Sequence, residues 1–188
     1  GIFNRGEINP RGHPKIVNYY GPHPPRAPRA FLETCFGGMK NQPEPENIKH
    51  HFSGIFLVTE SGKVIGQRRG NKPNIDNPGK IGPFGGSANV GENPKEAIWR
   101  ELTQEETNLK IEPNSIKHLL DEVAWRAPAR EWRVRHFYYV LIKDSDLETM
   151  EVYEGQGWTQ TRSPEEPELT ETGRPVVKRL FSKLNLQP

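Results

Sequence analysis

Three oxygen-bearing side chains near the middle of the chain have a spacing that suits metal binding. Glu101, Gln104 and Glu105 occupy positions i, i+3 and i+4 of a stretch whose pattern predicts a helix from Pro94 to Asn108. Because an α-helix turns by about 100° per residue, the three side chains share one face. Two carboxylates and an amide oxygen suit Mg²⁺ or Mn²⁺, which relieve their repulsion. An ordinary acidic surface helix is the alternative interpretation.

The helix that carries these groups has a well-marked beginning. Asn93 is a favourable N-cap, Pro94 suits the first helical position, and Glu96 completes a capping box. Just upstream, Gly85 and Gly86 allow the backbone to approach a ligand closely. Apolar residues flank the acidic face, so we expect it to border the core and not to face open water.

A set of residues around this helix has a fixed spacing. The set is Gly86, Glu92, Arg100, Glu101, Leu102 and Glu105. This spacing resembles the Nudix box of Nudix hydrolases, and a softer resemblance extends over about residues 54–184. The resemblance implies an α/β fold, the Nudix-type α/β/α sandwich with a mixed β-sheet between helices.

The segment departs from the family pattern near its end. Gln104 replaces the first glutamate of the Glu-Glu pair, and an amide oxygen ligates a metal without bringing charge. The segment also has one residue too many, because Glu105–Leu109 looks like the end of the box shifted by one. A one-residue helical bulge near 103–106 would let Glu106 take a ligand position instead.

Two further positions differ from the family. Asn108 replaces the closing glycine, and we expect it to end the helix in the left-handed conformation that asparagine tolerates. Asn89 stands where many members carry another glutamate. Together with Gln104, these changes keep a second interpretation open. In it, the chain is a catalytically impaired Nudix-fold module that binds nucleotide or RNA ends, or a protein partner.

The resemblance implies an enzyme that needs Mg²⁺, with Mn²⁺ as a possible substitute. It would hydrolyse the diphosphate of a nucleoside diphosphate derivative, such as a nucleotide sugar, a dinucleotide or a nucleoside triphosphate, by attack of water at phosphorus. By the same resemblance, Arg100 would orient Glu101, and Glu92 would pair with Arg100 as a structural contact. The expected metal ligands are the backbone carbonyl of Gly86 and the side chains of Glu101, Glu105 and Gln104.

Other candidates lie outside the box. The general base often does so in this family, and our candidate is Glu154, with Glu105 as the alternative. Arg68 and Arg69 follow a predicted strand and either clamp phosphate or remain solvated loop residues. Trp158 either stacks on the nucleoside base or belongs to the core or its rim.

Basic and aromatic residues alternate in the predicted hairpin at Trp125–Arg135, a composition that suits RNA. A twisted hairpin with water-facing arginines is the interpretation we favour; the RNA-directed version would be an RNA pyrophosphatase. His50, His51 and His136 have no carboxylate at a motif spacing, so we expect them to be structural.

Composition limits the remaining classes. The chain has 188 residues and a net charge of +2, which is too balanced to indicate nucleic acid by itself. The longest apolar runs, such as Gly54–Val58 and Phe137–Ile142, are far shorter than the ~20 residues of a membrane span. The single cysteine, Cys35, excludes an internal disulfide and a cysteine-based zinc cluster and favours a reducing compartment. We therefore expect a cytoplasmic protein with no membrane partner.

Residues 1–47 hold eight of the eighteen prolines, so we expect an N-terminal extension there and the Nudix domain at 48–188. The extension is either a tail or an extended arm that docks through Ile16–Tyr20 and Ala30–Phe36. A homodimer is a further expectation, because dimers are common in the family. The predicted strands are Gly54–Val58, Val64–Arg68, Leu119–Trp125, Trp132–Ile142 and Met150–Tyr153, and the predicted closing helix is Pro175–Leu184.

Overall fold

A computed structural model of the chain describes residues 6–8, 14–20, 48–126 and 131–188. The chain divides into two compact units. One unit comprises Gly1–His51 and Asp121–Arg135, and the other comprises Phe52–Leu120 and His136–Pro188. The second unit contains the whole Gly86–Leu109 motif, so it holds the candidate site. The boundary expected at residue 48 stays a prediction.

A β-sheet forms the centre of the second unit. Its strands are β3 (His50–Thr59), β4 (Val64–Arg68), β5 (Ile81–Gly82), β6 (Phe84–Ser87), β7 (Lys117–Arg126), β8 (Glu131–Ile142) and β9 (Trp158–Thr161), of which β3, β7 and β8 also contribute to the first unit. The strand order is β7-β8-β3-β4-β5, with β6 paired to β3 and β9 paired to β4. The pairings of β3 with β4 and β6, and of β4 with β5 and β9, are antiparallel.

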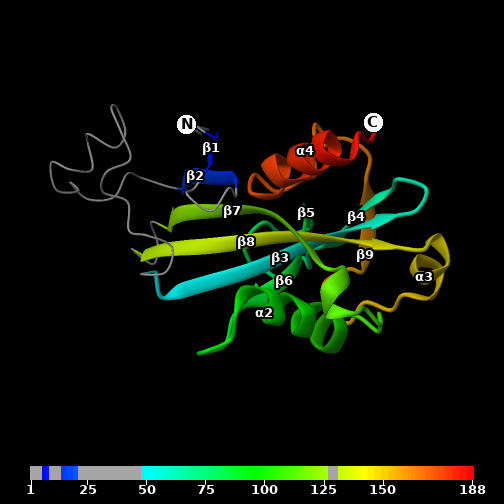
Figure 1. Cartoon of the computed structure of the whole chain (residues 1–188), viewed down its shortest axis with the longest axis horizontal. Coiled ribbons are helices and arrows are strands. Elements are labelled where there is room, and N and C mark those ends of the chain that lie inside the picture. Colours follow the sequence, from blue (N-terminus) through cyan, green and yellow to red (C-terminus); the bar gives the residue numbers. More distant parts are fainter. Residues whose placement is uncertain (1–5, 9–13, 21–47, 127–130) are drawn as a thin grey trace, which may run out of the picture. The chain divides into compact units, whose positions relative to one another are not determined.

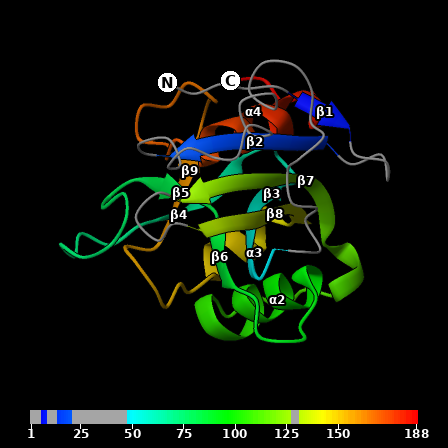
Figure 2. The same ribbon diagram turned by 90° about the vertical axis from the view of Figure 1, so that its left-hand side faces the viewer.

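Helices cover both faces of this sheet. Along β3, Ile55 and Leu57 join a buried cluster with Ile98 of α2 (Pro94–Arg100). Phe56 points the other way, toward α4 (Gly173–Leu184). Figure 1 shows α4 in red above the strands and α2 in green below them, and the turned view in Figure 2 agrees. The side chains of a strand alternate between its faces, so β3 needs a helix on each side. The predicted α/β/α sandwich is confirmed.

The predicted helix Pro94–Asn108 begins where expected but changes from an α-helix to a π-helix after Arg100. Asn93 accepts a hydrogen bond from the backbone of Glu96 at 2.9 Å, which completes the capping box. The α-helix α2 ends at Arg100, and a π-helix, η2 (Glu101–Glu106), continues from it. The bulge expected from the extra residue is therefore present.

The region after β8 differs from the prediction. A short helix, α3 (Asp144–Thr149), follows β8, and β9 was not foreseen because its four residues carry only a weak alternating pattern. The predicted strand at Met150–Tyr153 is wrong as a strand, since the segment forms only a single antiparallel bridge, between Val152 and Thr107. A short 3₁₀ turn, η3 (Pro113–Ser115), leads into β7.

The first unit contains β1 (Gly6–Ile8) and β2 (Pro14–Tyr20), which are antiparallel to each other. β2 pairs in parallel with residues 121–126 of β7, so the sheet is mixed as predicted. Ile16–Tyr20, one of the two stretches expected to dock, lies within β2. The other stretch, Ala30–Phe36, lies outside the described residues. In the described parts of the chain, no helix is long and apolar enough to cross a membrane.

Candidate active site

Two glycines of β6 form the floor of the site. β6 pairs with β3 so that Gly85 lies opposite Gly54 and Gly86 lies opposite Ser53. Gly85 has a φ of 149°, and a Cβ on it would meet the backbone oxygen of Ser53 at 2.0 Å. A Cβ on Gly86 would lie 2.6 Å from the carboxyl carbon of Glu101. Both positions therefore need glycine, the second because a carboxylate occupies the space of its side chain.

Arg100 connects two glutamates beside this floor. Its Nε donates to Glu92 Oε1 at 2.8 Å, and its Nη1 donates to Glu101 Oε1 at 2.9 Å. A further bond of 3.1 Å from Nη2 to Glu92 makes that pair two-pronged. The guanidinium lowers the pKa of Glu92, and the pKa of Arg100 is raised in return. These contacts fix the carboxylate of Glu101 in place.

The π-helix changes which glutamate shares a face with Glu101. The N–H of Thr107 bonds to the carbonyl of Leu102, five residues earlier, at 3.1 Å. With this longer turn, Glu106 comes to the side of the helix that faces β6. Glu106 is 2% exposed, and its Oε2 accepts a hydrogen bond of 2.9 Å from the backbone N–H of Gly85. The extra residue is thus absorbed in the helix, and a buried carboxylate results.

The two residues expected as ligands from α-helical spacing lie elsewhere. Gln104 is exposed. The side chain of Glu105 is 58% exposed, with its Oε1 at 4.0 Å from Nη1 of Arg100. The structure therefore brings Glu106, the alternative left open by the shifted motif, to the floor beside Glu101.

A loop after α3 carries Glu154 to the same place. The N–H of Tyr153 bonds to the carbonyl of Glu106 at 2.8 Å, which fixes the loop at its start. Gln156 fixes it at its end, where its N–H donates to Arg68 O at 2.8 Å and its side chain donates to Arg69 O at 2.9 Å. The exposed Glu154 lies between these two attachments.

The electrostatics show that the acidic groups act on one another. Burial raises the pKa of Glu106 to about 8, and the charges of Glu154 and Glu101 add to the rise. Burial also raises the pKa of Glu101, although Arg100 opposes the shift. Carboxylates that repel one another in a poorly solvated place are costly to ionise without a nearby cation.

The donor set suits a hard divalent cation. Among the residues that the structure describes, no three His, Cys, Asp or Glu side chains form a ready-made metal site. Mg²⁺ does not require one, because it usually keeps several waters and takes one or two protein carboxylates plus substrate phosphates. Glu101 and Glu106 are two carboxylates of this kind, and Gly86 lies so close to Glu101 that a Cβ on it would meet the carboxylate.

A model of the NUDIX domain matches residues 49–180, which include every residue of this site. The chain belongs to the Nudix family. The predicted family and the predicted Nudix-type hydrolase class are therefore confirmed. The pattern of glycines, Arg100 and glutamates described above is the Nudix box of this chain, and η2 is the second half of its Nudix helix. No curated protein matches the chain.

Solved Nudix structures share the fold at low sequence identity. The Nudix domain of Shewanella oneidensis NrtR in complex with ADP ribose is 16% identical, with a TM-score of 0.56, over 84% of this chain and 99% of that chain. A MutT Nudix hydrolase from Burkholderia pseudomallei is 18% identical, with a TM-score of 0.55, over 70% and 97%. A bifunctional NMN adenylyltransferase/ADP ribose pyrophosphatase from Francisella tularensis, in complex with AMP and a manganese ion, is 14% identical. Its TM-score is 0.52, over 82% of this chain and 44% of that one.

The two candidate arginines of the Nudix site differ in their contacts. Arg68 donates to Gly79 O at 2.9 Å and forms an ion pair of 2.8 Å with Glu168, so its guanidinium supports neighbouring loops. Arg69 donates its Nε to Asp76 O at 2.7 Å, and its charge is close enough to lower the pKa of Glu106. Trp158, at the start of β9, is 39% exposed.

The arginine-rich hairpin belongs to the first unit. Arg135 pairs with the buried Glu122 at 3.1 Å, and Arg133 pairs with Glu131. His50 also reaches Glu131, at 3.0 Å. Residues 127–130 lie outside the described chain, so the turn of the hairpin is not described. Among its described arginines, Arg133 and Arg135 are half-buried and form ion pairs within the hairpin, whereas the favoured interpretation expected them to face water.

Sequence reasoning missed two residues that shape the Nudix site. Thr107 ends the π-helix, and its hydroxyl donates to Leu102 O at 2.6 Å and accepts from the N–H of Leu109 at 3.2 Å. Gln156 anchors the Glu154 loop. The sequence did offer a signal for Thr107, because a threonine directly after two glutamates can bond to the backbone at the end of a helix. No local signal marks the second, because its partners are far away in sequence.

Proposed function

We propose that the chain is a divalent-metal-dependent pyrophosphohydrolase of nucleoside diphosphate derivatives. The observation that carries the proposal is the buried carboxylate of Glu106 beside Glu101, on a floor of glycines. Burying two carboxylates together is unfavourable unless a cation joins them, and the raised pKa of each reflects that cost. Mg²⁺ or Mn²⁺, when bound, supplies neutralisation of diphosphate charge and a more acidic water.

The residues around the carboxylates hold them ready for this task. Arg100 orients Glu101, and Glu92 holds Arg100 in turn. The N–H of Gly85 holds one oxygen of Glu106 and leaves the second oxygen for a ligand. In this assignment Glu106 replaces Glu105, and Gln104 has no part in the metal site.

Glu154 is the proposed general base. It accepts the proton of the attacking water as the water oxygen forms a bond to phosphorus and the bridging phosphorus–oxygen bond breaks. A positioned base of this kind contributes about 10²–10⁴-fold to the rate. Arg69 binds a phosphate of the substrate through its guanidinium, and the exposed ring of Trp158 offers a face for the nucleoside base.

ADP ribose is the first substrate to test. The solved domain of NrtR contains it, and the Francisella tularensis protein is titled an ADP ribose pyrophosphatase. Nucleotide sugars, dinucleotides, nucleoside triphosphates and capped RNA complete the panel. Each is incubated with Mg²⁺ or Mn²⁺, and the products are identified by mass spectrometry.

The matched variant is Glu101→Gln, which keeps the size of the side chain and removes its charge. Turnover of one substrate class by the wild type and its loss in the variant support the proposal. If a panel member binds but is not hydrolysed with either metal, the proposal is replaced by the catalytically impaired binding module.

Light scattering on the same preparation tests the expected homodimer.

A further inference from the structure

The end of the Nudix helix is joined to the segment that leads to Glu154. Glu106–Asn108 runs antiparallel to Glu151–Tyr153 through one bridge, between Thr107 and Val152. Two backbone hydrogen bonds flank that bridge, from Asn108 N to Glu151 O at 3.3 Å and from Tyr153 N to Glu106 O at 2.8 Å. Glu154 therefore directly follows Tyr153, the residue whose backbone is bonded to Glu106.

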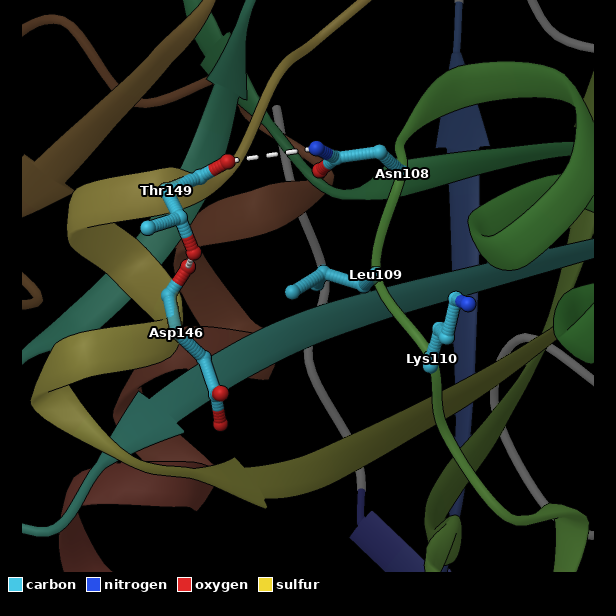
Figure 3. Close-up of a pocket in the computed structure, with 5 residues that line it drawn as sticks. All are labelled: Asn108, Leu109, Lys110, Asp146 and Thr149. Atoms are coloured by element: carbon cyan, nitrogen blue, oxygen red, sulfur yellow. Dashed lines mark hydrogen bonds between the residues drawn. The ribbon is translucent and has the colours of Figure 1, made fainter.

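The side chain of Asn108 extends the ladder on its outer side. Its Oδ1 accepts the N–H of Glu151 at 2.9 Å, and its Nδ2 donates to the carbonyl of Thr149 at 3.2 Å. Figure 3 shows the second bond, between Asn108 and Thr149. Both residues line a pocket of about 270 Å³. The amide therefore uses its acceptor and its donor on the same segment, and an aliphatic side chain has neither group.

The backbone conformation does not explain asparagine at this position. Among the described residues other than glycine, only Asn77 and Asn185 have positive φ values. The expected left-handed helix end at Asn108 is therefore wrong. The π-helix ends instead at Thr107, whose backbone is extended. What distinguishes Asn108 from the glycine of the family motif is its pair of side-chain hydrogen bonds.

We propose that Asn108 is a positioning residue that acts through Glu154, by tying the 149–153 segment to the catalytic helix. The inference rests on the proposed function. Gln156 holds the far side of the Glu154 loop, and the backbone bond from Tyr153 to Glu106 remains, so loss of the Asn108 side-chain contacts loosens the near side only. Asn108 is exposed, so the loss of its two side-chain bonds changes the stability of the fold little. Its main effect is then on the position of Glu154.

A double-mutant cycle between Asn108 and Glu154 tests the inference. We expect Asn108→Ala to lower kcat about tenfold with little change in KM. This is the lower end of the 10–100-fold loss that follows when a residue supporting an active-site group is removed. In a Glu154→Gln background the same change has no further effect, because the group it positions is gone. Asn108→Asp keeps the acceptor for Glu151 and recovers part of the loss. Lys110→Ala, in the same cavity, retains wild-type activity.

Amide hydrogen exchange gives a readout that needs no activity. In Asn108→Ala we expect faster exchange at Glu151 and Tyr153, with unchanged exchange in the β4–β9 pairing. The inference would be overturned if the fold-loss in kcat of the double variant equalled the product of the two single losses. It would also be overturned if hydrogen exchange at Tyr153 were unchanged in Asn108→Ala. If the wild type hydrolyses no member of the panel, the proposed function fails. The exchange at Tyr153 then decides by itself whether Asn108 fixes the segment.

Discussion

One carboxylate oxygen of Glu106 accepts a hydrogen bond of 2.9 Å from the backbone N–H of Gly85, 21 residues earlier in the chain. The bond joins the π-helix to the glycine floor and exists only because the helix widens by one residue after Arg100. It selects Glu106, and not its exposed neighbour Glu105, as the partner of Glu101. An insertion that looks damaging in the sequence therefore leaves a complete pair of carboxylates.

The first prediction compares these two neighbouring glutamates. Glu106→Gln should lower kcat by at least about 100-fold, since removing even an outer partner of a metal ligand costs 10–100-fold. Glu105→Gln removes the same charge from a position that is 58% exposed, so its loss should be several-fold at most. Steady-state kinetics with the substrate found in the panel measures both. A larger loss in Glu105→Gln than in Glu106→Gln would restore the α-helical assignment of the ligands.

The second prediction concerns pH and stability without divalent cations. Burial raises the pKa of Glu106 from its ordinary 4.5 to about 8, so between these values the folded protein holds a proton that the unfolded chain has released. Its contribution to stability is complete below pH 4.5 and is lost as the pH rises through 8. The free energy of unfolding should fall by roughly 1 kcal/mol per pH unit in this window.

Urea denaturation in a chelating buffer at several pH values measures this slope. Glu106→Gln cannot ionise, so it should flatten the slope and be relatively more stable at pH 8. An identical slope in the variant and the wild type would show that Glu106 is ionised in the folded protein throughout.

Local signals in the sequence were enough for much of the scaffold. The capping box at Asn93 and the hairpin strand Val64–Arg68 depend on neighbours within a few residues, and both appear as predicted. The π-turn was signalled only indirectly, by the shift of the motif after Arg100. Sequence alone left Glu105 and Glu106 as alternatives because periodicity does not specify how a helix absorbs an extra residue.

The proximity of Glu154 to the box depends on contacts between distant segments. Its loop is fixed by Tyr153 and Gln156, whose partners lie on η2 and at the end of β4. No residue pattern encodes such pairings, so Glu154 was a candidate only through the family resemblance. The hydrogen bonds of Asn108 were missed for the same reason, and helix-end propensity led to the wrong conformation there.

The third prediction separates folding from activity at the glycine floor. Gly86→Ala places its Cβ 2.6 Å from the carboxyl carbon of Glu101, a flexible group that can move aside. We expect a folded protein with activity lowered by about 100-fold, because Glu101 leaves its position. Gly85→Ala meets the backbone oxygen of Ser53 at 2.0 Å with φ at 149°, and it should lose at least about 2 kcal/mol of stability. Thermal unfolding and kinetics of both variants measure the contrast, and equal unfolding temperatures would contradict it.

The fourth prediction removes the extra residue itself. Deleting Gln104 places Glu106 four residues after Glu101 and turns the bond between Thr107 N–H and Leu102 O into an ordinary α-helical one. We expect the protein to fold and its carboxylate pair to persist. Mn²⁺ at a hundred times its Kd should then stabilise both the deletion variant and the wild type by about 2.7 kcal/mol. Gln104→Ala, which keeps the chain length, is the matched control. A folded deletion variant that Mn²⁺ no longer stabilises would show that the π-turn shapes the metal site beyond setting its register.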